Sequence, residues 1–239
     1  MKFIISVEKI KPIIKNYSRF VDEAKIKVNS DGIESLGFSR DMVTAFYFKI
    51  PKAQFITFGF EKDFEFGMNI EVLYDIIERF KSGFLTLTID KSSLVLSCDN
   101  RKFTIPFIEI SSDNDINIDE LKNFTCSFSM NGGEFKKIIE DLKIADNYKI
   151  KIICDKTVSF VCDGDIIKTE VNTEISAENQ ASSFYPIEKL SKIDFSEELQ
   201  FQFAKDYPIK ITFSNGFLLI APNIEEENVV YEEEVEQQV

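Results

Sequence analysis

Cysteine is the residue type in this chain best suited to metal binding or redox chemistry, yet its spacing favours neither. The four cysteines are Cys98, Cys126, Cys154 and Cys162. They are widely spaced, no two form a Cys-x-x-Cys pair, and most lie in alternating apolar and polar runs that are typical of strands. We interpret them as buried reduced thiols, with a metal or redox site as the alternative.

General acid and base catalysis is poorly supported, because the chain contains no histidine. This removes the commonest general base, the Ser-His and Cys-His pairs and the commonest zinc ligand. The sequence also contains no P-loop, HExxH or GxSxG motif. Asp113 and Asp115 are close together but lie in a polar stretch, where solvated acids are the simpler explanation. We expect no enzyme, cofactor or metal, and an acid-rich metal site is the remaining enzymatic alternative.

Nine basic residues form a second group with a possible chemical role, which is the binding of a polyanion. They are Lys9, Lys11, Lys15, Arg19, Lys136, Lys137, Lys143, Lys189 and Lys192. They occur on the polar faces of three of four expected helices, as the four-residue spacing of Lys11, Lys15 and Arg19 illustrates. Any one solvated helix can carry lysines for ordinary reasons. Together, however, they indicate a common surface that tolerates nucleic-acid phosphates without reading bases.

The overall charge limits where such a surface can lie. The formal net charge is −13, and residues 225–239 contribute seven Glu with no Lys or Arg. Because phosphate affinity comes from clustered cations, an acidic chain cannot bind nucleic acid over its whole surface, although one basic face remains possible. The second expected helix opposes the pattern, since Glu71, Asp75 and Glu78 dominate its polar side.

The elements that would position these residues follow an order that appears four times. In the first unit, a strand at 2–7 precedes a helix near 10–24 and strands at 25–28, 32–37 and 43–50. In the second, a strand at 64–69 precedes a helix near 71–81 and strands at 84–89, 93–98 and 102–108. In the third, a strand at 125–130 precedes a helix near 134–145 and strands at 148–154, 157–162 and 167–175. In the fourth, a strand at 181–184 precedes a helix near 186–193 and strands at 199–204, 208–214 and 217–221.

These four β-α-β-β-β units predict an α+β protein with antiparallel sheets. The strands alternate apolar and polar residues, as in Lys149-Ile150-Lys151-Ile152, so each sheet should have one solvent face and one face covered by helices. A polar stretch around Ser111-Ser112-Asp113-Asn114-Asp115 separates the first two units from the last two. We therefore expect an N-terminal domain at 1–108, a connector at 109–123, a C-terminal domain at 124–224 and an acidic, flexible tail at 225–239.

Particular motifs in this arrangement resemble the PCNA family, the archaeal and eukaryotic DNA sliding clamps, from Met1 to about Glu227. The motifs in the first half are Ile10-Lys11-Pro12-Ile13-Ile14, Val21-Asp22-Glu23-Ala24 and Phe66-Gly67-Met68-Asn69-Ile70. Those in the second half are Gly133-Glu134-Phe135, Asp141-Leu142, Tyr207-Pro208-Ile209-Lys210-Ile211 and Leu219-Ile220-Ala221-Pro222-Asn223-Ile224-Glu225.

The resemblance implies a sliding-clamp fold in which three two-domain subunits join head to tail, so that twelve helices line a hole around duplex DNA. Ring closure in the family would match an edge strand near 99–105 with one near 166–174. The implied function is that of a processivity factor, which tethers polymerase, nuclease and ligase to DNA in replication and repair. The implied partners are duplex DNA, other clamp subunits, a clamp loader and client proteins that carry short hydrophobic and aromatic motifs.

The resemblance also implies a pocket for the client motif beneath the connector. Its residues would be Phe38, Met42, Val43, Ile116, Ile118, Leu121, Pro208, Leu219, Ala221, Pro222 and Ile224. Ordinary core or loop packing is the alternative reading of each. The acidic second helix, the glutamate-rich tail and the absence of histidine depart from an average clamp and are consistent with a specialised subunit of a mixed ring.

Two alternative functions remain, one within the clamp class and one outside it. One is a checkpoint-like clamp paralogue with a different loader and clients, and the other is a β-rich interaction protein whose lysines never meet DNA. The sequence also lacks an apolar run long enough to span a membrane, and its first residues become charged too early for a signal peptide. We therefore expect an intracellular protein without membrane contact, nucleoid-associated or cytoplasmic, or nuclear in a eukaryote.

Overall fold

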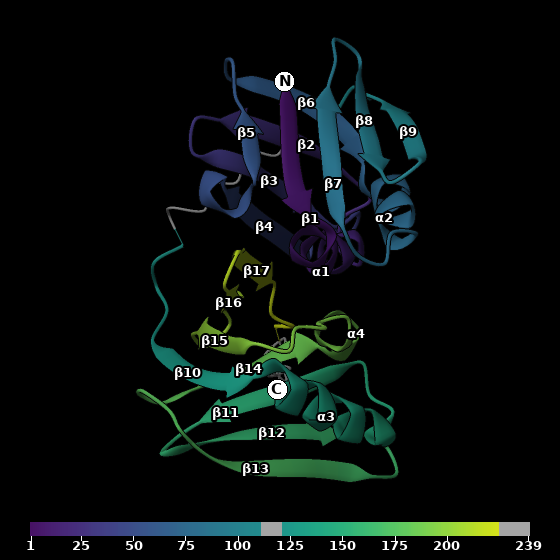
Figure 1. Ribbon diagram of the computed structural model, residues 1–239. Helices are drawn as coiled ribbons and strands as arrows, with labels where there is room; N and C mark the ends of the chain where they lie inside the picture. The colour runs from purple at the N-terminus through teal and green to yellow at the C-terminus, as the bar shows by residue number, and fades with distance from the viewer. Residues whose placement is uncertain (111–120, 225–239) are drawn as a thin grey trace, which may run out of the picture.

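The computed structural model describes residues 1–110 and 121–224, which form two similar halves (Figure 1). The first half contains β1 (Lys2–Ser6), α1 (Val7–Ser18), β2 (Glu23–Asn29), β3 (Gly32–Phe38), β4 (Thr44–Pro51), β5 (Thr57–Gly59), β6 (Phe64–Asn69), α2 (Ile70–Glu78), β7 (Phe84–Ile89), β8 (Ser93–Cys98) and β9 (Arg101–Pro106). The second contains β10 (Cys126–Asn131), α3 (Gly132–Leu142), β11 (Lys149–Cys154), β12 (Thr157–Asp163), β13 (Lys168–Ser176), β14 (Ala181–Pro186), α4 (Ile187–Ser191), β15 (Glu198–Phe203), β16 (Ile209–Phe213) and β17 (Gly216–Ile220). Apart from β5, the order matches the four predicted units.

The strands form three sheets, one of which runs through both halves. Their orders are β5-β1-β7-β8-β9, β10-β15-β16-β17-β4-β3-β2-β6 and β13-β12-β11-β14. In the eight-stranded sheet, β17 of the second half pairs antiparallel with β4 of the first, with Leu218 opposite Phe46. All strand pairs are antiparallel, so the predicted fold class is confirmed. The two halves are joined by main-chain hydrogen bonds in addition to the connector.

Helices α1, α2 and α3 begin where a polar side chain caps them, whereas α4 follows Pro186 without a side-chain cap. The Ser6 hydroxyl accepts from the backbone N–H of Glu8, and the Asn69 side chain accepts from the N–H of Val72. Asn131 serves the same purpose at α3, where its side chain accepts from the N–H of Gly133. Such caps satisfy amide groups that have no partner within the helix.

The predicted end of the first helix was wrong. Residues 10–24 were expected to be helical, but α1 starts earlier and ends at Ser18. The segment that follows turns sharply, and β2 already pairs with β6 at Glu23, opposite Asn69. Val21 and Ala24 are buried as the helical period requires, but they are buried from the turn and from the strand. The other helices also end earlier, with α2 stopping at Glu78 instead of residue 81.

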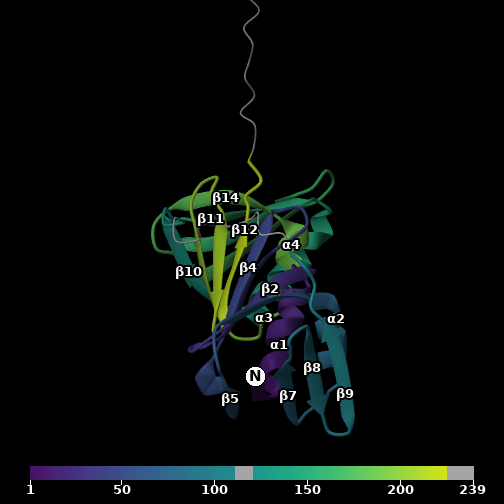
Figure 2. The same ribbon diagram turned by 90° about the horizontal axis from the view of Figure 1, so that it is seen from above.

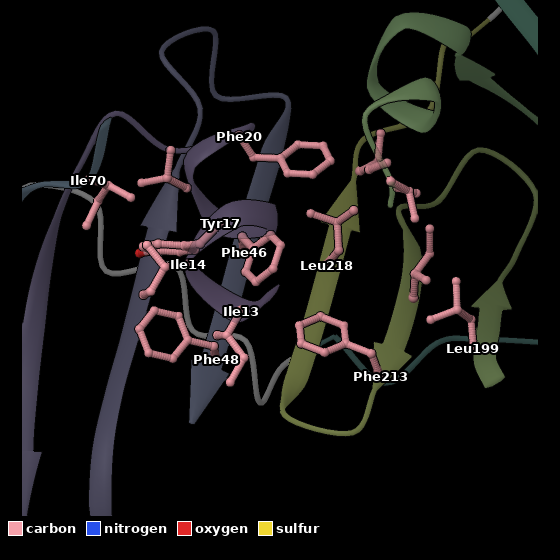
Figure 3. Packing of buried hydrophobic residues seen from close by; sticks show 14 of the residues in the cluster. Ile13, Ile14, Tyr17, Phe20, Phe46, Phe48, Ile70, Leu199, Phe213 and Leu218 are labelled. Atoms are coloured by element: carbon pink, nitrogen blue, oxygen red, sulfur yellow. The ribbon is translucent and has the colours of Figure 1, made fainter. Parts of the chain in front are cut away.

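The hydrophobic core extends across the boundary between the halves (Figure 3). Tyr17 of α1 meets Phe46 of β4 with ring centroids 5.2 Å apart, and Phe46 lies 5.3 Å from Phe213 of β16. The Tyr17 hydroxyl shares a 2.7 Å hydrogen bond with the Ser35 hydroxyl inside this core. Burial raises the pKa of Tyr17, so the phenol stays neutral. Helix α1 is therefore anchored in a core to which both halves contribute.

All four cysteines are buried and free, as the strand-like sequence around them predicted. In the part of the chain that the structure describes, no cluster of three or more Cys, Asp or Glu is arranged to hold a metal ion. None of the described helices is long and apolar enough to cross a membrane.

Candidate nucleic-acid interface and client pocket

Three of the predicted basic residues converge on one carboxylate, that of Asp194, which follows α4. Lys15 Nζ lies 2.8 Å and Arg19 Nη2 2.9 Å from Asp194 Oδ2, while Lys136 Nζ lies 3.1 Å from Oδ1. The hydrogen bond from Lys15 is the main reason that the pKa of Asp194 lies well below its usual range. The carboxylate thus links α1 of the first half to α3 of the second. Sequence reasoning missed Asp194, because no periodicity distinguishes it from the many other acids.

Lys11 is directed to the neighbouring helix. Its ammonium donates to the backbone carbonyls of Glu78 and Phe80, at 2.9 and 3.1 Å. These carbonyls lie at the C-terminal end of α2, where a cation complements the helix dipole. Lys11 therefore holds α1 against α2 and has a structural task beside any contact with phosphate.

Lys189 of α4 and Lys192, the C-cap residue of that helix, are both paired with acids. Lys189 is mostly buried, and its ammonium lies 2.5 Å from Asp41 Oδ2 in the loop between β3 and β4. That hydrogen bond, together with one from Ser39, lowers the pKa of Asp41 to about 2. Lys192 pairs with Glu188 one turn away at 3.0 Å. The structure therefore directs Lys189 toward the β3–β4 loop.

Lys9, Lys137 and Lys143 are exposed, and within the described residues their ammonium groups make no ion pair or hydrogen bond. On α2, Glu71, Asp75 and Glu78 are exposed as expected. The predicted basic residues thus divide into exposed lysines and cations that are already engaged by protein groups. Whether any of them faces DNA stays a prediction.

The residues expected to form a client pocket lie mostly at one end of the eight-stranded sheet, where β3 and β17 end and β4 and β16 begin. Phe38 and Leu219 both lie opposite Ala45 in the strand register, and the backbone N–H of Ala221 donates to the carbonyl of Val43 at 2.8 Å. Pro208 immediately precedes β16, and Pro222 follows the same end of β17.

The exposure of these residues is uneven. Met42 is 45% exposed and adopts a left-handed backbone conformation with φ of 57°, and Ile224 is 68% exposed. Leu219 is buried, which agrees with ordinary packing. Leu121 is half-buried, whereas Ile116 and Ile118 lie outside the described residues. The structure brings the strand-end residues together, and their role as a binding site stays a prediction.

The strands that the resemblance assigned to ring closure are the last strands of their sheets. β9 ends the five-stranded sheet and β13 ends the four-stranded sheet (Figure 1). β9 presents the exposed residues Arg101 and Lys102, whereas β13 presents Glu170 and Glu174 together with one base, Lys168, and is acidic on balance. The two edges therefore carry opposite charge.

Comparison with known proteins gives a consistent result. Residues 117–217 match the family model "Proliferating cell nuclear antigen, C-terminal domain". The DNA polymerase sliding clamp of Methanocella arvoryzae is 25% identical, covering 95% of this chain and 99% of that protein. DNA polymerase sliding clamp 1 of Sulfolobus acidocaldarius is 23% identical, covering 87% and 91%.

Solved structures agree over the same length. A structure of the C-terminal region of FEN-1 bound to A. fulgidus PCNA has a TM-score of 0.84 at 20% identity, covering 95% of this chain and 99% of that one. A PCNA2-PCNA3 complex from Sulfolobus tokodaii has a TM-score of 0.81 at 21% identity, covering 94% and 100%. The helices, sheets and free edges described above therefore define a sliding-clamp fold. Over nearly its whole length, the chain is therefore similar to the sliding clamps of the PCNA family, and the family model covers its second half.

Proposed function

We propose that this chain is a subunit of a ring-shaped DNA sliding clamp, which encircles duplex DNA and serves as a processivity factor. The observation that carries the proposal is the agreement with sliding clamps over nearly the whole chain, in sequence and in fold. The role requires no bond to be made or broken by this chain. A ring on duplex DNA leaves only by opening or by reaching an end, so weak lysine-phosphate contacts suffice while it slides.

Ring closure would join β9 of one subunit to β13 of the next. A sheet edge presents unpaired N–H and C=O groups that can pair with another strand, and a head-to-tail contact that closes forms a ring. The opposite charges of the two edges allow copies of this chain to close on themselves. A ring of three copies is therefore the form that we propose first, and a mixed ring with related subunits is the alternative that the acidic face of α2 favours.

Client proteins would bind at the end of the eight-stranded sheet around Met42, Val43 and Ala221. Their short hydrophobic and aromatic motifs fit a site whose described members are apolar and, apart from the buried Leu219, at least partly exposed. The solved A. fulgidus clamp was bound to the C-terminal region of FEN-1, which supports a nuclease as one client class. Tethering raises the concentration of polymerase, nuclease or ligase near its DNA substrate, while a separate loader would hydrolyse ATP and open the ring.

This role would place the protein wherever the cell keeps its DNA, at the nucleoid or in the cytoplasm, or in a nucleus. The domain limits of 1–108 and 124–224 belong to the same proposal. The eight-stranded sheet makes the two halves one connected body despite this division.

The first test is the absolute mass of the full chain, by size-exclusion chromatography with light scattering near physiological salt and at several concentrations. We expect three times the 27.6 kDa chain mass. Reversing the charge of the β9 edge with Arg101→Glu and Lys102→Glu should yield smaller species. Adding Glu170→Lys and Glu174→Lys should restore the trimer, because the charge pair is then exchanged.

Lys52→Glu with Lys62→Glu is the matched control, because both lysines are exposed and lie in the segments that flank β5, outside β9 and β13 and their paired strands. A wild-type chain that stays monomeric at every concentration would contradict the three-copy ring. Loss of the trimer in the control as well would show that the edges are not the determinant.

A further inference from the structure

The carboxylate of Asp194 forms ion pairs with cations that, under the proposed function, would face DNA. We call this carboxylate and its cations the Asp194 network. Lys15, Arg19 and Lys136 come from α1 and α3, and all three surround one carboxylate within 3.1 Å. Their side chains are 39%, 32% and 48% exposed, so solvent reaches each of them. The Asp194 side chain is only 23% exposed. The acid is thus nearly enclosed by cations that themselves remain accessible.

Asp194 is held in place by its backbone, independently of its carboxylate. The buried Asn16 side chain donates to the Asp194 carbonyl at 3.1 Å and accepts from the Asp194 N–H at 3.2 Å. Arg19 adds a 2.9 Å bond from Nη1 to the Lys192 carbonyl. The next residue, Phe195, stacks on Phe213 with ring centroids 4.4 Å apart. Removing the carboxylate charge therefore leaves several contacts that keep this loop on α1.

The network has a direct electrostatic consequence for phosphate binding. A cation that is hydrogen-bonded to a carboxylate must give up or share that bond before it binds a phosphate, and the carboxylate itself repels phosphate. Cations that are neutralised locally also release fewer counterions when DNA arrives. Three of the nine predicted basic residues are thereby restrained by a single acid.

We propose that Asp194 is a positioning residue that limits DNA contact: it gathers Lys15, Arg19 and Lys136 and weakens their binding to phosphate, so that the ring stays mobile on the duplex. The inference rests on the proposed function, because it needs these helices to face DNA. Its partner chemistry is the phosphate backbone, without base recognition. Without the charge of Asp194, all three cations would be available to bind DNA phosphates, so the acid limits the strength of the protein-DNA contact.

The decisive variant is Asp194→Asn, which keeps the shape of the side chain and the backbone bonds to Asn16 but removes the charge. Asp63→Asn, at the exposed turn before β6, removes the same charge from the net total without touching the network. Asp194→Glu keeps the charge at the site. Circular dichroism and light scattering of all four proteins establish that they fold and assemble alike.

Binding of the full-length protein to a fluorescently labelled duplex is then measured by anisotropy at several salt concentrations. For Asp194→Asn we expect roughly threefold to tenfold tighter binding at low salt, and a slope of log K against log salt that is steeper by about 1 to 3, because each newly available cation adds about 0.9. Asp63→Asn and Asp194→Glu should keep the wild-type slope.

The outcomes separate the two proposals. If the wild type and all variants fail to bind duplex, the DNA-facing role itself is wrong. If they bind and Asp194→Asn has the slope of Asp63→Asn, or binds more weakly, DNA binding stands and the restraining role of Asp194 is wrong. If Asp194→Asn does not assemble, the test uses Lys15→Gln added to the Asp194→Glu variant. The proposal expects the salt slope to stay unchanged, because Lys15 is already restrained by the acid. A flatter slope overturns the proposal.

Discussion

At the scale of single residues, ion pairs made by Lys15, Arg19 and Lys189 connect the two halves of the chain. Lys189 reaches from α4 to Asp41 in the β3–β4 loop, and Lys15 reaches Asp194 from a position 179 residues earlier. Both acids have a pKa below the usual range, and in each case the hydrogen bond from lysine is the main cause. These lysines therefore contribute to the native fold whether or not DNA is present.

The pKa of Asp41 leads to a prediction about acid stability. A carboxyl group whose pKa is lowered on folding stabilises the native state above its unfolded pKa of 3.8, and this contribution disappears as the pH falls toward about 2. Because the Asp41 side chain is 48% exposed, solvent screening keeps the effect small. Thermal unfolding between pH 5 and pH 2 should show a smaller loss of Tm for Asp41→Asn than for the wild type. Equal losses would show that the pair does not contribute.

At the scale of elements, α1 and α2 are joined by the side chain of Lys11, which bonds carbonyls at the end of α2. Pro12 is accommodated in α1, and the apolar residues of both helices pack on the sheets. α2 contains no basic residue in its own last turn, and Lys11 of α1 supplies the positive charge at its C-terminal carbonyls. The C-terminal carbonyls of α2 are therefore capped by a side chain from the neighbouring helix.

Lys11→Met tests this contribution of one helix to the other. It removes two charge-assisted hydrogen bonds while keeping the apolar stem, so we expect a loss of about 1 to 2 kcal/mol in the free energy of unfolding. Chemical denaturation would measure it. Lys9→Met is the matched control, because Lys9 is exposed on the same helix, and its effect should stay within about 0.5 kcal/mol. Similar values for both variants would argue against the capping role.

At the scale of the whole molecule, the two halves form one body because a sheet and a core cross the boundary between them. β17 pairs with β4, and the rings of Phe46, Phe195 and Phe213 pack together across it. Figure 2 shows the same strands side by side from above. A chain cut at the connector would expose this shared surface.

The acidic tail supports a prediction at the same scale, although residues 225–239 lie outside the described part of the chain. The fold described here closes with Ala221, whose N–H donates to Val43, and with Asn223, whose N–H donates to Phe184. Deletion after Glu227 should therefore leave the thermal midpoint within about 2 °C of the full chain, as scanning calorimetry would show. A drop of many degrees would mean that the tail packs on the fold.

The amino-acid sequence by itself was sufficient for the element types, their fourfold order, the antiparallel class and the similarity to sliding clamps. These follow from local signals, because alternation along a strand such as Gln200-Phe201-Gln202-Phe203 and the capping residue Asn69 act over a few positions. The short strand β5 and the early end of α1 escaped prediction, because pairing with distant strands decides both. Only the tertiary structure decided which cations remain available and which are engaged, since Asp194 meets Lys15, Arg19 and Lys136 through contacts between residues 58 to 179 positions apart.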